Sequence, residues 1–377
     1  MEGDFPSDVP RPAAALLALL LALAAAVSVV FSRSAWKSLL FFAAFVPLPV
    51  LLSLFAYANG YRLPLVAQEA AVSLSLLGAL GVNYATEGRQ KRFIKSAFRQ
   101  YLSPDVIERL IAHPELLKLG GERRTLSVFF SDLQGFTSIA EGMDPEALTA
   151  LLNEYLSAMT DIVHEEGGTL DKYVGDAIIA FWNAPLDQPD HALRAARAAV
   201  RCQERLAELR PVFRQKSGKD LFMRIGLNTG AAVVGNLGSR SRFDYTILGD
   251  AVNLASRLEG INKQFGTQVL ASETLRSALG EGIAAREISR VAVVGRKEPV
   301  RVFELLPPGA IAAREKTLSA FAVGLREFYA GRFSAALESF LPIEKTDPPA
   351  AAYARKCRVL IDHPPERWDG VWIMAEK

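Results

Sequence analysis

Two aspartates have the positions expected of a catalytic metal site. Asp132 ends the apolar run in FFSDLQGFT, and Asp176 lies in the turn of DKYVGDAIIAFW. Each alone has a simpler explanation, because acids often cap helices and Asp is common in turns. If the two strands pair, however, both carboxylates lie at one sheet edge. Hard oxygen ligands suit Mg²⁺, and a two-metal site activates an attacking oxygen while stabilising a leaving one.

A second group of residues has features suited to phosphate. Gly135, Phe136 and Thr137 lead into a helix, where glycine lets the backbone approach closely and free amides bind phosphate. Asn253 and Arg257 lie four residues apart in TILGDAVNLASRLEG and therefore share a helix face. The planar guanidinium of Arg257 could clamp a phosphate. Taken alone, this last pair is equally explained by a solvated helix face.

The elements that must position these residues follow from the hydrophobic pattern. Thr125–Ser131 is predicted as a strand, and a long helix begins at Asp144–Pro145 and ends before Gly167–Gly168. Further strands are expected at Thr169–Val174, Ala177–Trp182, Phe222–Asn228, Ala231–Asn236, Gln268–Ala271, Ala284–Val294 and Val300–Leu305, with helices at His191–Leu209 and Asp250–Phe265. The order predicts an α+β fold with a ferredoxin-like βαββαβ core, in which helices cover one face of an antiparallel sheet.

The first 86 residues differ in composition from the rest of the chain. They hold only eight of its 84 charged side chains. Three apolar runs, Ala13–Phe31, Ser38–Tyr57 and Leu63–Tyr84, each have about the ~20 residues that a helix needs to cross a bilayer. Residues 1–86 are therefore predicted to form three transmembrane helices, with Pro47 and Pro49 kinking the second.

Basic residues orient these helices. Arg33 and Lys37 lie in the first loop and Arg62 alone in the second, and a basic cluster follows the third helix: Arg89, Lys91, Arg92, Lys95 and Arg99. Because basic loops stay inside, the N-terminus and second loop are predicted outside, with a long cytoplasmic C-terminal part. The expected location is the plasma (inner) membrane, in contact with lipid, as a multi-pass protein.

The remaining segments complete the expected organisation. Residues 87–120 are interpreted as a juxtamembrane helical linker, with Ser103 as an N-cap and Pro104 as the first helical residue; a plain amphipathic helix and a dimer-forming linker both stay open. Residues 121–307 form the soluble α+β domain. Residues 308–377 are predicted to be a small helical tail, either a tetratricopeptide-like hairpin or a cap on the preceding domain.

Composition excludes several classes of protein. The net charge of +2 argues against binding a nucleic acid polymer by bulk charge. Two distant cysteines, Cys202 and Cys357, cannot build a disulfide scaffold or a cysteine zinc cluster and fit a reducing compartment.

Four segments in order, FFSDLQGFTSIAE, LDKYVGDAIIAFWNAP, RIGLNTGAAVVGNLGS and YTILGDAVNLASRLEG, resemble the catalytic domain of class III nucleotidyl cyclases. The resemblance covers about Thr125 to Leu306. The three membrane helices, the linker FIKSAFRQYLSPDVIERL and the tail ending ERWDGV also resemble bacterial cyclases that carry a CHASE-type sensor of the second kind.

The resemblance implies a metal site. Asp132 and Asp176 match the metal-binding aspartates, and the carbonyl of Leu133 matches the backbone ligand. Two Mg²⁺ or Mn²⁺ ions per site are expected.

The resemblance also assigns substrate contacts. Lys172 and Thr246 match the pair that reads the purine edge and resemble the bacterial adenylyl pattern, whereas a guanylyl enzyme usually carries Glu and a small residue such as Cys. An ammonium donates to adenine N1 and a hydroxyl accepts from its amino group, but guanine presents N1–H and O6. Asn253 matches the ribose-orienting residue, and Arg257 matches the arginine that stabilises charge on the transferring phosphorus. Arg296 falls where many members carry a phosphate-binding Lys.

In this family the two halves of each site come from different protomers, so the resemblance implies a homodimer with two equivalent sites. It predicts an adenylate cyclase, a phosphorus–oxygen lyase that converts ATP to 3′,5′-cyclic AMP and pyrophosphate. Two alternatives stay open: a catalytically silent cyclase-like signalling module and a guanylate cyclase. The full set of matching residues disfavours the first, and Lys172 with Thr246 disfavours the second.

Overall fold

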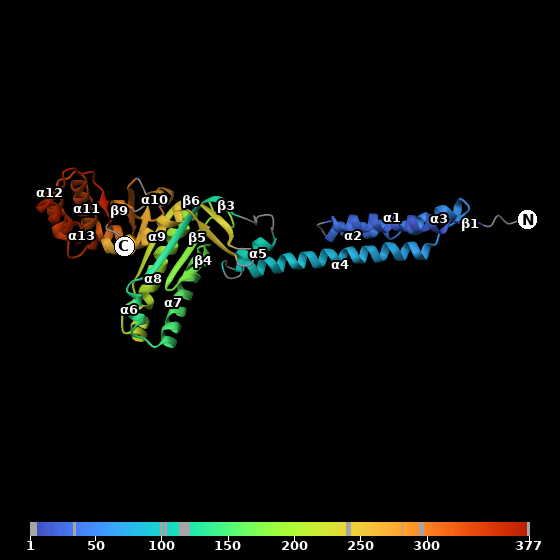
Figure 1. Cartoon of the computed structure of the whole chain (residues 1–377), viewed down its shortest axis with the longest axis horizontal. Helices are drawn as coiled ribbons and strands as arrows, with labels where there is room; N and C mark the ends of the chain where they lie inside the picture. The colour runs from blue at the N-terminus through green and yellow to red at the C-terminus, as the bar shows by residue number, and fades with distance from the viewer. Residues whose placement is uncertain are drawn as a thin grey trace, which may run out of the picture. The chain divides into compact units, whose positions relative to one another are not determined.

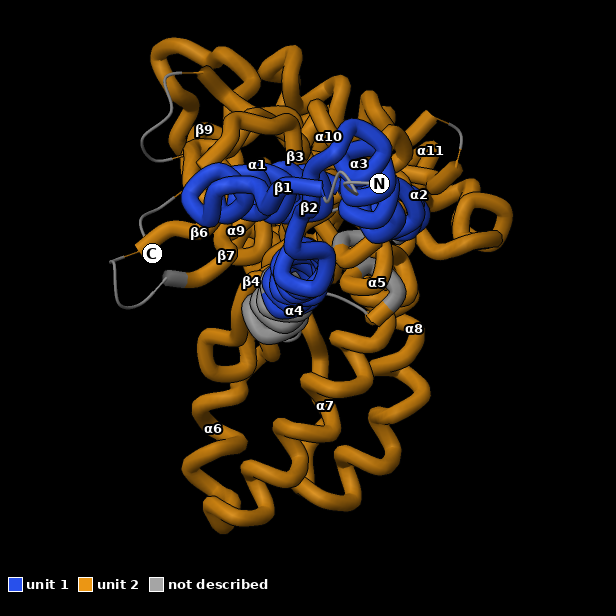
Figure 2. Tube along the Cα trace, turned by 90° about the vertical axis from the view of Figure 1, so that its right-hand side faces the viewer, with its two compact units in different colours: residues 1–96 blue, residues 97–377 orange. Residues whose placement is uncertain are grey.

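The computed structural model describes residues 6–32, 35–98, 101, 104–112, 121–238, 243–280, 282–293 and 298–374 (Figure 1). The chain divides into two compact units, Met1–Ser96 and Ala97–Lys377 (Figure 2). Each unit is described by itself.

The first unit is a bundle of apolar helices. It contains α1 (Arg11–Val30), α2 (Ala35–Phe45), α3 (Leu48–Ala58) and most of α4 (Leu65–Phe98), with a short parallel pair of strands, β1 (Ser7–Asp8) and β2 (Tyr61–Arg62). Within the described residues, three stretches of helix are long and apolar enough to cross a membrane: Arg11–Val30, Trp36–Ala58 and Leu65–Ala85. The predicted number of membrane-capable helices is therefore confirmed.

Hydrogen bonds link α4 to α1, and a proline interrupts the second membrane-capable span. Ser75 Oγ donates to the carbonyl of Ala22 at 2.9 Å, and Asn83 Nδ2 donates to the carbonyl of Val29 at 2.8 Å, so α4 packs along α1. The second span is interrupted between α2 and α3, with Pro47 at the N-cap of α3. The kink expected from the prolines is thus present, because proline removes a helical hydrogen bond.

The second unit is built on a mixed sheet. One end of the sheet has the strand order β6–β3–β5–β4, formed by β3 (Glu122–Leu133), β4 (Thr169–Val174), β5 (Ala177–Trp182) and β6 (Met223–Gly238), each antiparallel to the next in this order. Helices α7 (Pro145–Glu165) and α8 (His191–Ser217) connect these strands in the predicted βαββαβ order. The ferredoxin-like core is therefore confirmed.

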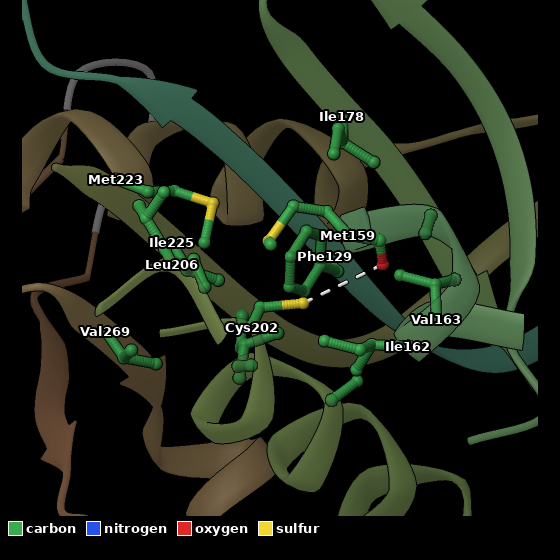
Figure 3. Packing of buried hydrophobic residues seen from close by; sticks show 14 of the residues in the cluster. Phe129, Met159, Ile162, Val163, Ile178, Cys202, Leu206, Met223, Ile225 and Val269 are labelled. Carbon is green, nitrogen blue, oxygen red and sulfur yellow. Dashed lines mark hydrogen bonds between the residues drawn. The ribbon is translucent and has the colours of Figure 1, made fainter. Parts of the chain in front are cut away.

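Helices α7 and α8 cover one face of this sheet. Asp144 caps α7, because its carboxylate accepts from the amides of Glu146 and Ala147. The hydrophobic core between these helices and the sheet contains Phe129, Met159, Ile178 and Met223, with Cys202 buried among them (Figure 3). Burial raises the pKa of the Cys202 thiol to about 12, so this cysteine is inert packing.

The opposite face carries α9 (Asp250–Phe265). Gly226 of β6 permits this contact, since a Cβ there would lie 2.2 Å from the carbonyl oxygen of Ala255 and 2.2 Å from the amide of Glu259. Helices therefore cover both faces, whereas one covered face was expected. The sheet is also mixed rather than purely antiparallel, because β6 runs parallel to β8 (Val269–Ser272).

Several bounds differ from the sequence predictions. The two strands expected on either side of Gly230 are one strand, β6, which pairs with β3 without interruption from Met223 to Val234. Helix α8 continues beyond Pro211 to Ser217. The elements that were not predicted include β7 (Phe243–Leu248), which pairs with β6, and α10 (Glu273–Ala278).

The C-terminal elements share a core with the sheet. Strands β9 (Ala285–Ala292) and β10 (Val300–Leu305) extend it, and β11 (Trp372–Ile373) pairs in parallel with β9. Helices α11 (Ala310–Tyr329), α12 (Phe333–Phe340) and α13 (Pro348–Asp362) pack against these strands. Buried residues of α9 belong to the same hydrophobic cluster. The linker is described in the end of α4 and in α5 (Pro104–Ala112), and the expected N-cap Ser103 lies outside the described residues.

Candidate active site

Two aspartates meet where β3 ends and the β4–β5 turn begins. Asp132 is the penultimate residue of β3, and Asp176 follows Gly175 in the turn. Oδ2 of Asp176 accepts a hydrogen bond of 2.9 Å from the backbone amide of Leu133. The antiparallel pairing of β3 with β5 thus brings together the three residues expected to hold metal.

The electrostatics of this cluster suit a cation. Burial raises the pKa of Asp176, and the neighbouring Asp132 carboxylate raises it further, against the lowering effect of the Leu133 amide. A divalent ion would relieve this repulsion, and both donors are hard oxygens. In the described part of the chain, no group of three or more His, Cys, Asp or Glu side chains could hold a metal ion. An ion held by Asp132 and Asp176 would therefore need its other ligands from backbone, water or phosphate.

An arginine that the sequence analysis missed closes one side of the cluster. Arg224 is the register partner of Asp132 across β3 and β6, and its Nη2 lies 2.9 Å from Oδ2 of Asp132. Its Nε lies 2.9 Å from Oε1 of Glu259 on α9. Burial raises the pKa of Glu259, and Arg224 opposes that rise. The sequence signal was a charged residue at the start of an apolar strand.

The segment after Asp132 and Leu133 leads into the short helix α6 (Phe136–Ala140). Gly135 has a φ of 69°, which favours glycine, and precedes the helix. Phe136 packs against the core, and Thr137 is exposed. These three predicted phosphate contacts thus begin three residues after Asp132.

Lys172 and Thr246 converge on a third residue, Asp171. Oγ1 of Thr246 on β7 donates a hydrogen bond of 2.9 Å to Oδ2 of Asp171, and Nζ of Lys172 lies 3.4 Å from its Oδ1. The pairing of β4 with β5 shifts register between Leu170 and Lys172. This bulge explains how two consecutive side chains approach each other, because regular strands direct neighbours to opposite faces.

Asn253 and Arg257 lie on α9, away from the buried face of that helix. Asn253 is exposed and Arg257 is partly exposed, whereas Leu254, Ala255 and Leu258 are buried. Glu259, two residues after Arg257, approaches Arg224. At about 100° per residue, Arg257 therefore points to a different side of α9 from the sheet-facing Glu259. The last predicted contact, Arg296, lies outside the described residues.

A separate hollow of about 660 Å³ lies near the start of α9. Its lining includes Thr229, Asp250, Glu273 and Arg301. Its lining contains none of the predicted site residues that the structure describes.

Comparisons with known proteins agree on the domain. A model of the family described as adenylate and guanylate cyclase catalytic domain matches residues 121–306. "Adenylate cyclase 1" of Rhizobium meliloti is 34% identical over 209 residues, which are 55% of this chain and 31% of that protein. The adenylate cyclase of Anabaena cylindrica is 34% identical over 220 residues, 57% of this chain and 42% of that protein. The chain thus spans less than half the length of these two relatives.

One solved structure of similar sequence is matched over nearly its whole length. The adenylyl cyclase CyaB from P. aeruginosa is 37% identical, and the match covers 50% of this chain and 97% of that chain, with a TM-score of 0.47.

Proposed function

Because residues 121–306 of this chain belong to the family of adenylate and guanylate cyclase catalytic domains, we propose that the protein is a membrane-anchored adenylate cyclase. It converts ATP to 3′,5′-cyclic AMP and pyrophosphate for intracellular signalling. The 3′ oxygen of the ribose forms a bond to the α-phosphorus and loses its proton, and the bond from that phosphorus to the leaving pyrophosphate breaks. Both relatives of similar sequence named above are adenylate cyclases.

In this proposal Asp132 and Asp176, with the carbonyl of Leu133, hold two Mg²⁺ or Mn²⁺ ions. When bound, such ions lower the pKa of an attacking hydroxyl and neutralise charge on phosphate oxygens. The raised pKa of Asp176 supports the assignment, because a carboxylate that resists ionisation beside another carboxylate gains most from a cation. Gly135, Phe136 and Thr137 then face the phosphates, and Arg296 adds positive charge.

The observation that carries the choice of ATP is the joint contact of Lys172 and Thr246 with Asp171. Two side chains from strands far apart in the sequence thereby present one ammonium and one hydroxyl together. The ammonium donates to N1 of adenine, and the hydroxyl accepts from the amino group. Guanine offers N1–H and O6 at these positions, so both contacts would fail.

The remaining groups act from a second copy of the chain. Asn253 orients the ribose, and Arg257 stabilises the charge that develops on the phosphorus. Their position off the sheet-facing side of α9 supports a homodimer, because Glu259 and not Arg257 approaches the metal cluster of the same chain. Two equivalent sites at a two-fold interface follow.

Three membrane-capable helices precede the cyclase domain. We place the domain in the cytoplasm and the N-terminus outside, because the largest basic cluster follows the third helix. The location is the plasma (inner) membrane, with lipid as a partner.

The direct test is turnover of ATP and of GTP, each with Mg²⁺ and with Mn²⁺, on membranes that contain the full chain. Formation of cyclic AMP with a preference for ATP is expected. Conversion of GTP in preference to ATP would make the protein a guanylate cyclase. Absence of turnover with either nucleotide and either metal would support the silent signalling module instead.

A further inference from the structure

Asp171 is a buried acid that the cyclase reaction as proposed does not use. Its exposed fraction is 5%. One carboxylate oxygen accepts from Thr246, and the other has no hydrogen-bond partner in the described part of the chain. The cation paired with that second oxygen is the ammonium of Lys172, at 3.4 Å. Burying a carboxylate costs folding free energy unless the group is paired, so the burial of Asp171 suggests a function.

The hydrogen bond to Asp171 fixes the direction in which the Thr246 hydroxyl works. A hydroxyl has one proton and two lone pairs, so threonine alone can either donate or accept. An ionised carboxylate can only accept. Because the Thr246 hydroxyl donates its hydrogen bond to Asp171, it has only lone pairs left with which to contact a third group. The hydroxyl then accepts from the amino group of adenine and has nothing to offer O6 of guanine.

The ion pair between Asp171 and Lys172 restricts the position of the Lys172 ammonium. The ammonium of Lys172 carries three protons, and its side chain is 43% exposed, so without a partner it would sample many positions. The contact with Asp171 holds it beside Thr246 and leaves protons for N1 of the base. The β-bulge in β4 makes this contact between consecutive residues.

We propose that Asp171 is a positioning residue that sets purine specificity, by making the Thr246 hydroxyl an acceptor and by holding the Lys172 ammonium beside it. This rests on the proposed cyclase function and names a determinant of its substrate choice that does not itself touch the base.

The test is the Asp171→Asn variant of the full chain, with the ratio of kcat/KM for ATP to that for GTP as the measurement. The amide will turn its oxygen toward the ammonium and its NH₂ toward Thr246. The threonine then accepts from Asn and donates to the base, which suits guanine. The ratio should fall by at least about tenfold, the scale on which a mispaired polar group changes specificity. Because both values come from one preparation, the ratio does not depend on the folded fraction.

A double variant separates this role from general damage. In a Thr246→Val background the hydroxyl is absent, so adding Asp171→Asn should change the ratio much less than in the parent, toward the roughly twofold limit of independent changes. Thr246→Ser keeps the hydroxyl and should keep the parent ratio. Glu166→Gln is the matched control: Glu166 is 8% exposed and pairs at 2.8 Å with Arg201 of α8, not with Lys172 or Thr246. It should leave the ratio unchanged.

Three results would overturn the proposal. The first is an unchanged ratio in folded Asp171→Asn. The second is an equally large effect of that change with and without the Thr246 hydroxyl. The third is failure of both Asp171→Asn and Asp171→Ala to fold, which would make Asp171 a purely structural residue.

Equilibrium binding of ATP and GTP, measured beside turnover, separates this proposal from the cyclase function. A parent chain that binds ATP over GTP without turning it over contradicts the cyclase function, and its binding ratio still tests Asp171. A parent chain that binds neither nucleotide contradicts both.

Discussion

Arg224 lies between two acids, with Nη2 at 2.9 Å from Asp132 and Nε at 2.9 Å from Glu259. The guanidinium occupies a position beside the carboxylate where a bound metal ion would also supply positive charge. In the absence of metal, this arginine is the cation that balances the proposed metal ligand.

Arg224→Met should lower the stability of the metal-free chain. It leaves two acids without their cation, and we expect a loss of about 1–3 kcal/mol, below the value for a fully buried pair because Asp132 is 35% exposed. Added Mn²⁺ should raise the melting temperature more in the variant than in the parent, because it replaces the missing charge. Arg214→Met, which removes an exposed pair with Asp220 at 3.6 Å, is the control and should change little. An equal Mn²⁺ effect in parent and variant would contradict the role given to Arg224.

Asp176→Asn should separate stability from activity. Because the pKa of Asp176 is raised in the folded chain, its stabilising contribution is present at low pH and is lost as pH rises through the folded pKa. At pH 7 the ionised group therefore destabilises the metal-free fold, and Asn should raise the melting temperature in EDTA while its side-chain oxygen still accepts from Leu133.

Turnover with Mg²⁺ or Mn²⁺ should meanwhile fall by at least about 10³-fold in Asp176→Asn and in Asp132→Asn, because nothing else in the site replaces that charge stabilisation. Substantial residual turnover in a folded variant would refute the metal assignment. The melting-temperature advantage of Asp176→Asn over the parent in EDTA should shrink as the pH is lowered from 7, because the parent's carboxyl becomes protonated, and a melting series across pH measures it.

Lys172 and Thr246, the two residues proposed to read the purine, can be replaced together. Lys172→Glu combined with Thr246→Cys should lower the use of ATP and raise the relative use of GTP, because a carboxylate accepts from guanine N1–H where the ammonium could only donate. The measurement is the ratio of kcat/KM values for the two nucleotides. A double variant with the parent's preference would show that other residues read the base.

Much of the core was predictable because its patterns are local. Strands β4, β5 and β10 and helix α9 have the bounds that periodicity predicted, since each is a short apolar run between turn residues or a clear helical stripe. Gly230 misled the prediction: Asn228–Thr229–Gly230 resembles a turn, yet the strand continues. A Cβ at Gly230 would lie 3.0 Å from Cβ of Ala251, so this glycine serves the close approach of α9.

The parts that the sequence analysis missed depend on pairing across the fold. Arg224 matters only because register places it opposite Asp132. Asp171 was missed because its hydrogen-bond donor Thr246 lies on β7, an element that was not predicted, and because a bulge cannot be recognised from one strand. The sequence thus predicted the residues that match a family motif, and not the residues that hold them in place.

The C-terminal helices should be needed for a stable cyclase domain. Asp347 is fully buried and pairs with Arg286 at 2.8 Å and Arg314 at 2.7 Å, and Tyr353 donates to the carbonyl of Ile288 at 2.8 Å. Asp347→Ala leaves the buried Arg286 with fewer partners and should cost about 3 kcal/mol, which urea unfolding would measure. Glu344→Ala removes an exposed pair with Arg358 and should change little. Equal stability of both variants would mean that the tail is not part of the domain's core.

A mixed-dimer experiment tests whether two chains share each site. Asp132→Ala damages the metal-binding half and Arg257→Ala the phosphate-stabilising half, so each variant alone should be inactive. Co-expressed chains form mixed dimers, in which one site receives both lesions and the other receives neither. Random pairing makes about half of the dimers mixed, and one site in two is then intact, so about a quarter of the parent's activity should return.

Recovery of this size cannot arise from sites built within single chains, because every chain in the mixture carries a lesion. Differential tags on the two variants, followed by sequential affinity capture, isolate the mixed dimers, and their specific activity should approach half that of the parent. Purified mixed dimers without activity would show that Asp132 and Arg257 do not act together across an interface. That result would leave the position of Arg257, off the sheet-facing side of α9, without a catalytic explanation.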